Sequence, residues 1–303
     1  MFCTYNRLYI EILFFFKKII YINLKPALYL VATPIGNRED ISMRALHVLN
    51  NVDIIACENT GHSSLLLSAY GIKKKLIALH QHNELDKAEY IAKFIIDGKS
   101  VAYISDAGTP TISDPGAGLV DYLHNLNFDI FSIPGPSALI TAFSLSGFET
   151  SHFQFFGFLP NTIGKRKKSL VNIYNSNITT ILYESPHRII KTLKAMREIF
   201  GNDHIIFIAR ELTKIFETYY RGKLGELIDE LESNKDNQKG EFVLIIKPLK
   251  KDMQKNKVIP LEEALKNTLN EISLKESVNV ISKIYNMSRK EIYSLALEIK
   301  KNE

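Results

Sequence analysis

The ten residues LYLVATPIGN, numbers 28–37, decide the class of fold. Residues 28–32 form a short apolar run that is typical of a buried strand, and Pro34 and Gly36 end that run in a loop. We expect a helix through Leu49 to follow, with Asp40 as its N-cap. The stretch therefore predicts one strand, loop and helix unit of an α/β protein.

The same unit recurs through the first half of the chain. We expect further strands at residues 53–58, 76–79, 101–104 and 130–133, and helices near 64–70, 87–96 and 118–126. Strands that alternate with helices predict a largely parallel sheet, and such sheets bind ligands at the carboxyl ends of their strands.

The second half restarts this pattern and ends in helices. We expect strands at residues 181–183, 205–208 and 242–246, a helix near 189–200, and short helices at 261–272, 274–285 and 289–300. Ser288 and Glu291 have the spacing of a capping box for the last helix. The last two helices resemble a helix-turn-helix in outline, a shape that also occurs in plain bundles.

These patterns predict four parts of the chain. They are an unassigned extension (residues 1–27), an N-terminal α/β domain (28–140), a C-terminal α/β domain (141–248), and a linker with a basic helical tail (249–303). The expected fold class is therefore α/β, with two α/β domains and a small C-terminal helical module.

The composition is that of a globular protein. Charged residues make up 23% of the 303 residues and hydrophobic residues 46%, which excludes a disordered chain. Cys3 and Cys57 are the two cysteines, too few for a disulfide framework or a zinc ribbon. We therefore expect a protein of the reducing cytoplasm.

The net charge of +5 is mild, but it is unevenly distributed. Residues 247–303 hold 12 Lys and Arg against 8 Asp and Glu, so nearly all of the excess lies in the last fifth of the chain. A second basic cluster consists of Lys165, Arg166, Lys167 and Lys168. Such a cluster is either a solvated loop or a patch for a phosphate backbone, and both interpretations stay open.

The amino-terminal residues 1–26 contain two apolar patches, at 12–16 and 19–22, which Lys17 and Lys18 separate. The patches are too short and too interrupted for a membrane-spanning helix, and no secretory signal is evident. We expect a dispensable leader or, alternatively, a helix that associates weakly with a surface. No membrane partner is expected.

Three loops with glycine and proline follow predicted strands. They are TPIGN (33–37), SDAGTP with ISDPG (105–116) and PGPSA (134–138). Glycine allows a ligand close to the backbone and proline makes the loop rigid, so three such loops at one end of a sheet favour a shared ligand cleft. Glu58 lies where a ribose-binding acid would sit, but the first loop lacks the G-x-G-x-x-G pattern and no Walker lysine follows it. Nicotinamide and nucleoside triphosphate sites are therefore excluded.

Several polar side chains cluster in the sequence. His80, His82 and Glu84 alternate along an extended segment, as metal ligands or as the polar side of a substrate pocket would, and we favour the pocket. Glu184 with residues 187–188, and residues 210–211, follow predicted strands. Ion pairing between these segments and a role facing the substrate both remain open.

A series of sequence runs matches one known family. The runs are LYLVATPIGN, DISMRAL, ALHQHNE, ISDAGTPTISDPG, PGPSALITA, FFGFLP, LYESPHR, ARELTK and KGEFVLI. From about Leu28 to its carboxyl end, the chain resembles the ribosomal RNA small subunit methyltransferase I family, the 16S rRNA cytidine-2′-O-methyltransferases of the tetrapyrrole methylase superfamily. The resemblance implies two α/β domains with S-adenosylmethionine in the cleft between them, a homodimer, and a decoding-centre cytidine of the 30S ribosomal subunit as substrate.

The resemblance also implies roles for individual residues. The cofactor would be lined by Thr33, Pro34, Ile35, Asp106, Gly108, Thr109, Pro110, Ser137, Ala138 and Tyr183. RNA phosphates would be held by Lys165, Arg166, Lys167, Lys168, Arg210 and Lys214. A ribose 2′-hydroxyl is weakly acidic and needs a base or an orienting acceptor, for which His82, Glu84 and Glu184 are candidates. Methyl transfer from a sulfonium is an in-line displacement that loses charge, so a dry, shaped cleft suffices and no metal is required.

Two residues depart from the family pattern. Asn59 stands where the family has Asp, and Gly61 stands where it has Arg. If that Arg contacts phosphate, this chain has lost one anchor, so a ribosome-binding protein with impaired catalysis stays an alternative. The other alternative is a tetrapyrrole (precorrin-type) methyltransferase, which would use the same cofactor site but would have little use for the basic tail.

Overall fold

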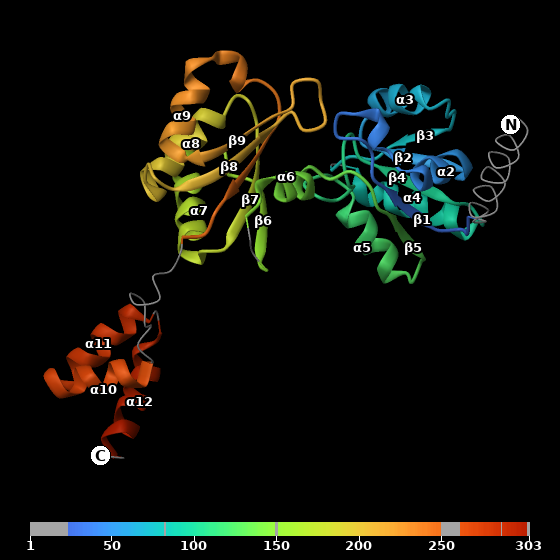
Figure 1. The fold of residues 1–303 in the computed structure, drawn as a ribbon. Helices are drawn as coiled ribbons and strands as arrows, with labels where there is room; N and C mark the ends of the chain where they lie inside the picture. The colour runs from blue at the N-terminus through green and yellow to red at the C-terminus, as the bar shows by residue number, and fades with distance from the viewer. Residues whose placement is uncertain (1–23, 82, 149–150, 250–260, 286, 302–303) are drawn as a thin grey trace, which may run out of the picture. The chain divides into compact units, whose positions relative to one another are not determined.

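The computed structural model describes residues 24–81, 83–148, 151–249, 261–285 and 287–301. The chain divides into two compact units, Met1–Pro248 and Leu249–Glu303 (Figure 1). Most of the expected extension at 1–27, and the expected linker at 250–260, lie outside the described residues. No described helix is long and apolar enough to cross a membrane.

The first sheet of the larger unit is parallel throughout, as its alternating strands and helices predict. Its strands are β1 (Leu28–Val31), β2 (Ile54–Cys57), β3 (Leu76–Ala78), β4 (Val101–Ile104) and β5 (Ile130–Ile133), in the order β3-β2-β4-β1-β5. Strands β4, β1 and β5 are neighbours, so the loops that follow them leave the sheet side by side (Figure 1).

Helices cover both faces of this sheet. They are α2 (Met43–Asn51), α3 (Thr60–Ala69), α4 (Glu84–Ile96) and α5 (Ala117–Asn125). Successive residues of a strand point to opposite faces. Tyr29 and Val31 accordingly pack with the apolar residues of α2 and α3, whereas Leu28 packs with those of α4 and α5. Burial on both faces explains why the strands read as continuous apolar runs.

The start of α2 differs from the prediction. Ser42, not Asp40, is the N-cap, and its side-chain oxygen accepts a hydrogen bond from Ala45 N at 3.0 Å. Asp40 ends a 3-10 turn, η1 (Arg38–Asp40), that Asn37 caps. The 3-10 turn occupies the residues before Ser42, so the helix starts two residues later than predicted.

The second sheet is mixed, and two of its strands were not expected. The strands are β6 (Phe153–Phe158), β7 (Thr179–Glu184), β8 (Ile205–Arg210), β9 (Thr218–Lys223) and β10 (Phe242–Ile246), in the order β6-β7-β10-β8-β9. Only β6 and β7 pair in parallel; the other neighbours are antiparallel. The unexpected strands β6 and β9 are the two edges of the sheet.

Helices also cover both faces of the second sheet. They are α6 (Ala138–Ser146), α7 (Ile163–Ser176), α8 (Ile189–Phe200) and α9 (Leu224–Ser233), with a 3-10 turn η2 (Lys235–Gln238). Leu244 of β10 packs with residues of α7, α8 and α9, whereas Val243 and Ile245 pack with residues of α6. Helix α6 spans the predicted boundary between residues 140 and 141, and the division of the α/β part into two domains stays a prediction.

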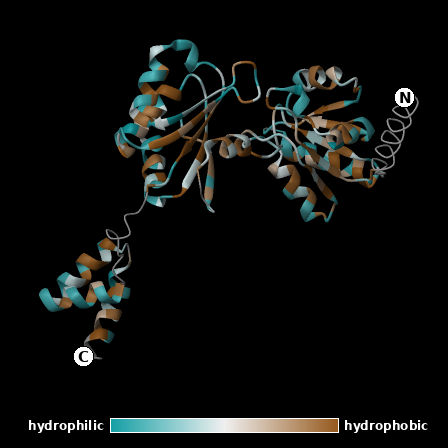
Figure 2. Cartoon of the chain, in the orientation of Figure 1, coloured by the Kyte–Doolittle hydropathy of each residue, from teal (hydrophilic) through white to brown (hydrophobic). Residues whose placement is uncertain are grey.

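The smaller unit contains three helices among its described residues, as expected. They are α10 (Leu261–Glu271), α11 (Leu274–Ile284) and α12 (Arg289–Lys301), and they enclose an apolar core that includes Leu265, Ile281 and Ile292. The predicted capping box of α12 is confirmed, because Glu291 N donates to Ser288 Oγ and Ser288 N donates to Glu291 Oε2. Figure 2 shows these helices alternating between hydrophobic and hydrophilic residues.

Candidate functional site

The loops that follow β1, β4 and β5 are tied to one another by hydrogen bonds. Thr33 N donates to Gly108 O at 2.9 Å, and Gly108 N donates back to Thr33 O at 3.0 Å. The Thr109 hydroxyl donates to Pro136 O at 3.1 Å. The prediction that these loops meet at one edge of the sheet is thereby confirmed.

A cavity of about 390 Å³ opens beside these loops. It lies within the larger unit, with the loops of the first sheet on one side and the ends of β6, β7 and β10 on the other. It is lined by Ile35, Ala107, Gly108, Thr109, Ile112, Ser113, Asp114, Ser137, Ala138, Phe158, Tyr183, Glu184, Ser185, Pro186, Leu212, Glu241, Phe242 and Val243. The volume falls in the range of small-molecule sites, roughly 300–1,000 Å³.

Six of the ten residues expected around a cofactor line this cavity. They are Ile35, Gly108, Thr109, Ser137, Ala138 and Tyr183. Thr33, Pro34 and Pro110 are buried and do not line it. The Thr33 hydroxyl instead donates to Ser105 O at 3.3 Å, so we assign these three residues to holding the loops in place.

Asp106 and Gly108 lie in the loop that follows β4. Asp106 does not line the cavity but adjoins its lining residue Ala107, and the Oδ1 atom of Asp106 is buried without a partner among the described residues. A buried oxygen of this kind costs about 1–3 kcal/mol unless a donor reaches it. Gly108 has a φ of +81°, which favours glycine, and its missing side chain leaves the backbone open to a ligand. At Gly108, therefore, main-chain groups of the cavity wall are open to a ligand.

Tyr183 forms part of the opposite wall. Its ring makes edge-to-face contacts with Phe155 and Phe158, at centroid distances of 4.9 and 5.7 Å. Its hydroxyl accepts a hydrogen bond from Leu139 N, at the start of α6, at 3.2 Å. Burial raises the pKa of the hydroxyl, so Tyr183 stays neutral and acts as a fixed apolar surface with one polar end.

Asp114 is a carboxylate on the cavity wall that the sequence patterns do not single out. Burial raises its pKa to about 6, against a hydrogen bond from Ser105, and the charges of Glu58 and Asp106 raise it further. Asp114 forms no ion pair with a described residue. The cavity therefore contains a half-buried acid that titrates close to neutral pH.

The loop that carries Asp114 is clamped by Tyr103. The fully buried Tyr103 donates its hydroxyl hydrogen to Pro115 O at 2.8 Å. Gly116 adopts a φ of +115°, and a Cβ placed on it would lie 2.3 Å from Tyr103 Cε1. The position of the loop is therefore set by a contact that only glycine permits.

Glu184 also lines the cavity, but its carboxylate is engaged. It is 2% exposed, accepts hydrogen bonds from the Thr192 hydroxyl at 2.6 Å and Ser185 N at 2.8 Å, and lies 3.2 Å from Arg188 Nε. Arg188 also donates to Leu159 O at 2.7 Å. The ion pair is thus made within one segment, and both oxygens of this carboxylate already accept hydrogen bonds from the protein.

The other two candidate bases lie elsewhere. Glu84 Oε1 accepts a hydrogen bond from Leu119 N at 2.9 Å, which fastens the start of α4 to α5, and Glu84 does not line the cavity. His82 lies outside the described residues. No described group of three or more His, Cys, Asp or Glu side chains could hold a metal ion.

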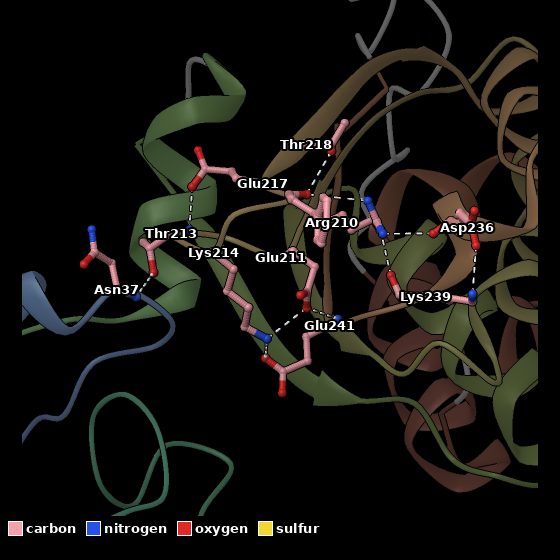
Figure 3. Close-up of polar contacts among 11 residues, drawn as sticks. Asn37, Arg210, Glu211, Thr213, Lys214, Glu217, Thr218, Asp236, Lys239 and Glu241 are labelled. Carbon is pink, nitrogen blue, oxygen red and sulfur yellow. Dashed lines mark hydrogen bonds and ion pairs between the residues drawn. The ribbon is translucent and has the colours of Figure 1, made fainter. Parts of the chain in front are cut away.

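Arg210 is buried, and its contacts are to main-chain oxygens of the protein. It is 9% exposed, and its guanidinium donates to Lys239 O at 2.6 Å, Asp236 O at 2.9 Å and Phe216 O at 3.5 Å (Figure 3). These contacts join η2 to the loop between β8 and β9. We therefore assign Arg210 to this loop rather than to RNA phosphate.

Lys214 is also held by acidic neighbours. Its Nζ lies 2.9 Å from Glu211 Oε1 and 3.0 Å from Glu241 Oε2 (Figure 3). Burial alone would lower the pKa of Lys214, but the two carboxylates outweigh it and raise the pKa. Asn37 N donates to Thr213 Oγ1 at 3.0 Å, so this loop also contacts the loop that follows β1. A lysine with two acidic partners is a weak anchor for phosphate.

The basic cluster 165–168 divides into two kinds of residue. Arg166 is 7% exposed and donates to the carbonyl oxygens of Pro160 and Asn161, and Lys167 lies 2.6 Å from Glu198. Lys165 and Lys168 are exposed and form no ion pair with a described residue. Of the six expected cations, these two are the ones that remain available to an anionic partner.

Comparisons with known proteins agree with this architecture. The family model of tetrapyrrole (corrin/porphyrin) methylases matches residues 27–228. Ribosomal RNA small subunit methyltransferase I of Haemophilus influenzae is 41% identical over 271 residues, which cover 89% of this chain and 96% of that protein. Its counterpart in Vibrio cholerae is 41% identical over 276 residues, which cover 90% and 95%. The chain belongs to the ribosomal RNA small subunit methyltransferase I family of tetrapyrrole methylases.

Solved structures share the fold of this family member. A cobalt precorrin-4 methyltransferase matches with a TM-score of 0.55 and 17% identity, covering 73% of this chain and 94% of that chain. Uroporphyrin-III-C-methyltransferase from Thermus thermophilus matches with a TM-score of 0.50 and 17% identity, covering 73% and 93%. At this level of identity the likeness shows the fold alone, and it confirms the predicted fold class.

In this family member, part of the cavity wall consists of residues that the sequence patterns did not select. Examples are Asp114, Ser185, Leu212 and Glu241. Each lies within one of the motif runs of the family: ISDPG, YESPHR, ARELTK and KGEFVLI. Their position inside a motif run of the family is therefore the sequence signal that could have identified these four residues.

The two departures from the family pattern lie at the start of α3. Asn59 is the N-cap of this helix, and its Oδ1 accepts hydrogen bonds from Gly61 N at 3.0 Å and His62 N at 3.1 Å. Asn and Asp cap helices about equally well, so this exchange keeps the local structure. Gly61 is exposed, and the chain has no side chain at the place where the resemblance leads us to expect an arginine.

Proposed function

We propose that this chain is an rRNA methyltransferase that transfers a methyl group from S-adenosylmethionine to the 2′-oxygen of a cytidine in 16S rRNA. The observation that carries the proposal is the cavity beside the three loops, in a chain 41% identical to relatives named ribosomal RNA small subunit methyltransferase I. We propose the 30S subunit as the substrate and the cytoplasm as the compartment in which the two meet.

The cavity fits the proposed cofactor. When bound, S-adenosylmethionine supplies an electrophilic methyl group on a positively charged sulfur. Gly108, Thr109, Ser137 and Ala138 would hold it through the main-chain groups of the loops. Tyr183 would pack against it from the second sheet.

The residues of this chain would accelerate the transfer mainly by holding the reacting groups in position in a dry cavity. The wall contains Ile35, Phe158, Leu212 and Val243, which exclude water from the reacting atoms. The hydrogen bonds among the loops hold that wall before any ligand arrives, so little ordering is needed at the moment of reaction. The hydroxyl that receives the methyl group also needs an acceptor for its proton.

We propose that the RNA is held by the exposed cations Lys165 and Lys168 and by the C-terminal tail (residues 249–303). Protein contacts to RNA rely largely on backbone phosphates and shape, for which separate exposed cations are suited. Support comes from the charge distribution, because residues 249–260 hold four Lys against one Asp, whereas residues 261–303 hold seven Lys and Arg against seven Asp and Glu.

We also propose that the protein works as a homodimer. The edge strand β6 pairs only with β7 among the described strands, and it exposes Phe153 and Phe156 by 42% and 40%. An exposed edge with large apolar side chains is typical of an interface. Sedimentation equilibrium of the full chain tests this, and a monomer at micromolar concentration would contradict it.

The assay that tests the proposed function supplies two substrates in parallel. Purified protein is incubated with labelled S-adenosylmethionine and either unmodified 30S subunits or a tetrapyrrole such as uroporphyrinogen III. We expect label in the RNA and none in the tetrapyrrole. Label in the tetrapyrrole alone would favour the alternative methyltransferase. Cofactor binding without any transfer would favour a ribosome-binding protein with impaired catalysis, the reading that Gly61 motivates.

Substitution of Gly108 by Ala tests the cofactor site. An L-residue at a φ of +81° costs about 1–2 kcal/mol, and relief of that strain moves the wall of the cavity. We expect the dissociation constant for S-adenosylmethionine, measured by calorimetry, to rise about tenfold or more. Gly98→Ala is the matched control, because Gly98 has a φ of +79° with no atom near its Cβ position and does not line the cavity. Equal binding by both variants would contradict the site.

Deletion of residues 249–303 tests the role of the C-terminal tail, including its three helices. These helices have their own core and belong to a separate unit, so the cavity should remain intact. We expect methylation of 30S subunits to fall about tenfold at moderate salt, because phosphate contacts are lost, while affinity for S-adenosylmethionine stays the same. Unchanged RNA methylation would show that the tail has another role.

A further inference from the structure

The cavity wall contains three carboxylates, and they differ in what surrounds them. Glu184 is enclosed by Thr192, Ser185 and Arg188, and Glu241 forms an ion pair with Lys214. Asp114 is half-buried and has no ion pair with a described residue. Of the three, Asp114 is therefore the carboxylate whose charge is not already neutralised by a cation.

The turn that carries Asp114 has a backbone that its neighbours hold in place. Ser113 has a φ of +63°, a conformation that non-glycine residues adopt rarely, and Gly116 has a φ of +115°. The hydrogen bond from Tyr103 to Pro115 O fastens the same turn to the buried end of β4. Backbone strain that the surrounding structure maintains in this way is typical of functional sites.

The charges that face Asp114 favour proton uptake. Glu58 follows β2 and Asp106 follows β4, and both are acidic groups that interact electrostatically with Asp114. Burial is the largest cause of the raised pKa, to about 6, and a hydrogen bond from Ser105 opposes it. A carboxylate with this pKa is ionised at neutral pH, yet it accepts a proton more readily than an ordinary Asp.

We propose that Asp114 is the general base of the methyl transfer, an assignment that rests on the proposed function. The 2′-oxygen of the cytidine forms its bond to the methyl carbon while the bond between that carbon and sulfur breaks. The electron pair of the broken bond stays on sulfur, which becomes neutral. The hydroxyl proton passes to the carboxylate of Asp114 and leaves to solvent after the product departs.

The test compares three variants at saturating S-adenosylmethionine with 30S subunits under single-turnover conditions. D114N removes the base, D114E keeps a carboxylate, and D121N removes an equal charge from the exposed surface of α5. We expect D114N to lower the rate constant about 100-fold and D114E to recover part of the loss, while D121N matches the wild type. Calorimetry should show that D114N binds S-adenosylmethionine within about threefold of the wild type.

The pH profile gives a second measurement that a structural role would not change. The active form is the ionised carboxylate, so the wild-type rate constant should rise as the pH passes through about 6 and then level off. D114N should lack this inflection. If D114N does not fold, the profiles of the wild type and D114E decide, and the absence of an inflection between about pH 5 and about pH 7 overturns the assignment.

The experiments distinguish a failure of the Asp114 assignment from a failure of the proposed function. An active wild type with a D114N variant of equal rate overturns the assignment alone. A D114N variant that loses cofactor affinity as much as it loses rate makes Asp114 a cofactor ligand and also overturns it. A wild-type protein that binds S-adenosylmethionine but methylates no RNA overturns the proposed function, and the assignment with it.

Discussion

Substitution of Gly116 by Ala should lower the free energy of unfolding by about 3 kcal/mol or more. Two destabilising effects add at residue 116. The backbone has a φ of +115°, which L-residues avoid, and the new Cβ would lie 2.3 Å from the ring of Tyr103. The ring cannot move away cheaply, because Tyr103 is fully buried and its hydroxyl donates to Pro115 O. Denaturation by urea, monitored by circular dichroism, measures the change.

Gly71→Ala separates these two costs. Gly71 has a φ of +70° and no atom within 4 Å of its Cβ position, so this variant pays for the backbone alone. We expect a loss of about 1–2 kcal/mol for it. If Gly116→Ala costs no more than Gly71→Ala, the clamp by Tyr103 is not what holds the loop. The methylation rate of Gly116→Ala should also fall, because the loop carries Asp114.

Substitution of Glu184 by Ala should destabilise the protein by about 3–5 kcal/mol. The carboxylate is almost fully buried, and its removal leaves Arg188 without its acidic partner and the Thr192 hydroxyl without its acceptor. A buried charge that loses its partner is costly, because water cannot replace the lost contacts. Thermal and urea denaturation of the variant measure the effect.

The matched control is Glu232→Ala. Glu232 forms an ion pair with Lys194 on the surface, where the two side chains are 42% and 44% exposed. Surface pairs contribute about 0–1 kcal/mol, so this variant should unfold almost as the wild type does. Equal, small losses in both variants would mean that Glu184 is free to act on the substrate, and Glu184 would then return as a candidate base.

The buried parts of the fold could be predicted from the sequence because burial leaves a mark in the residue pattern. Strand β10 and helix α8 have the predicted limits, since each presents an apolar run or an apolar stripe to the core. Strands β6 and β9 escaped prediction because each is an edge strand with several exposed residues, so neither has a continuous apolar run. Their pairing depends on neighbours that lie far away in the sequence.

The loops of the site were predictable, but the state of individual side chains was not. Glycine and proline marked the three loops, and the sheet order then brought them together. Arg166 and Arg210 look like surface cations in the sequence, yet each is buried and donates to main-chain carbonyl oxygens. Asp114 looks like an ordinary turn residue, and its burial becomes visible only when the loop is placed against the second sheet.

We propose that the cavity serves methyl transfer to a cytidine ribose of 16S rRNA. The most direct test is to incubate the purified full chain with S-adenosylmethionine and 30S subunits that lack the modification, and then to identify the modified nucleoside by mass spectrometry. We predict one 2′-O-methylcytidine per subunit, with the methyl group on the ribose. An RNA without any new methyl group, or with a methyl group on a base, would contradict the claim.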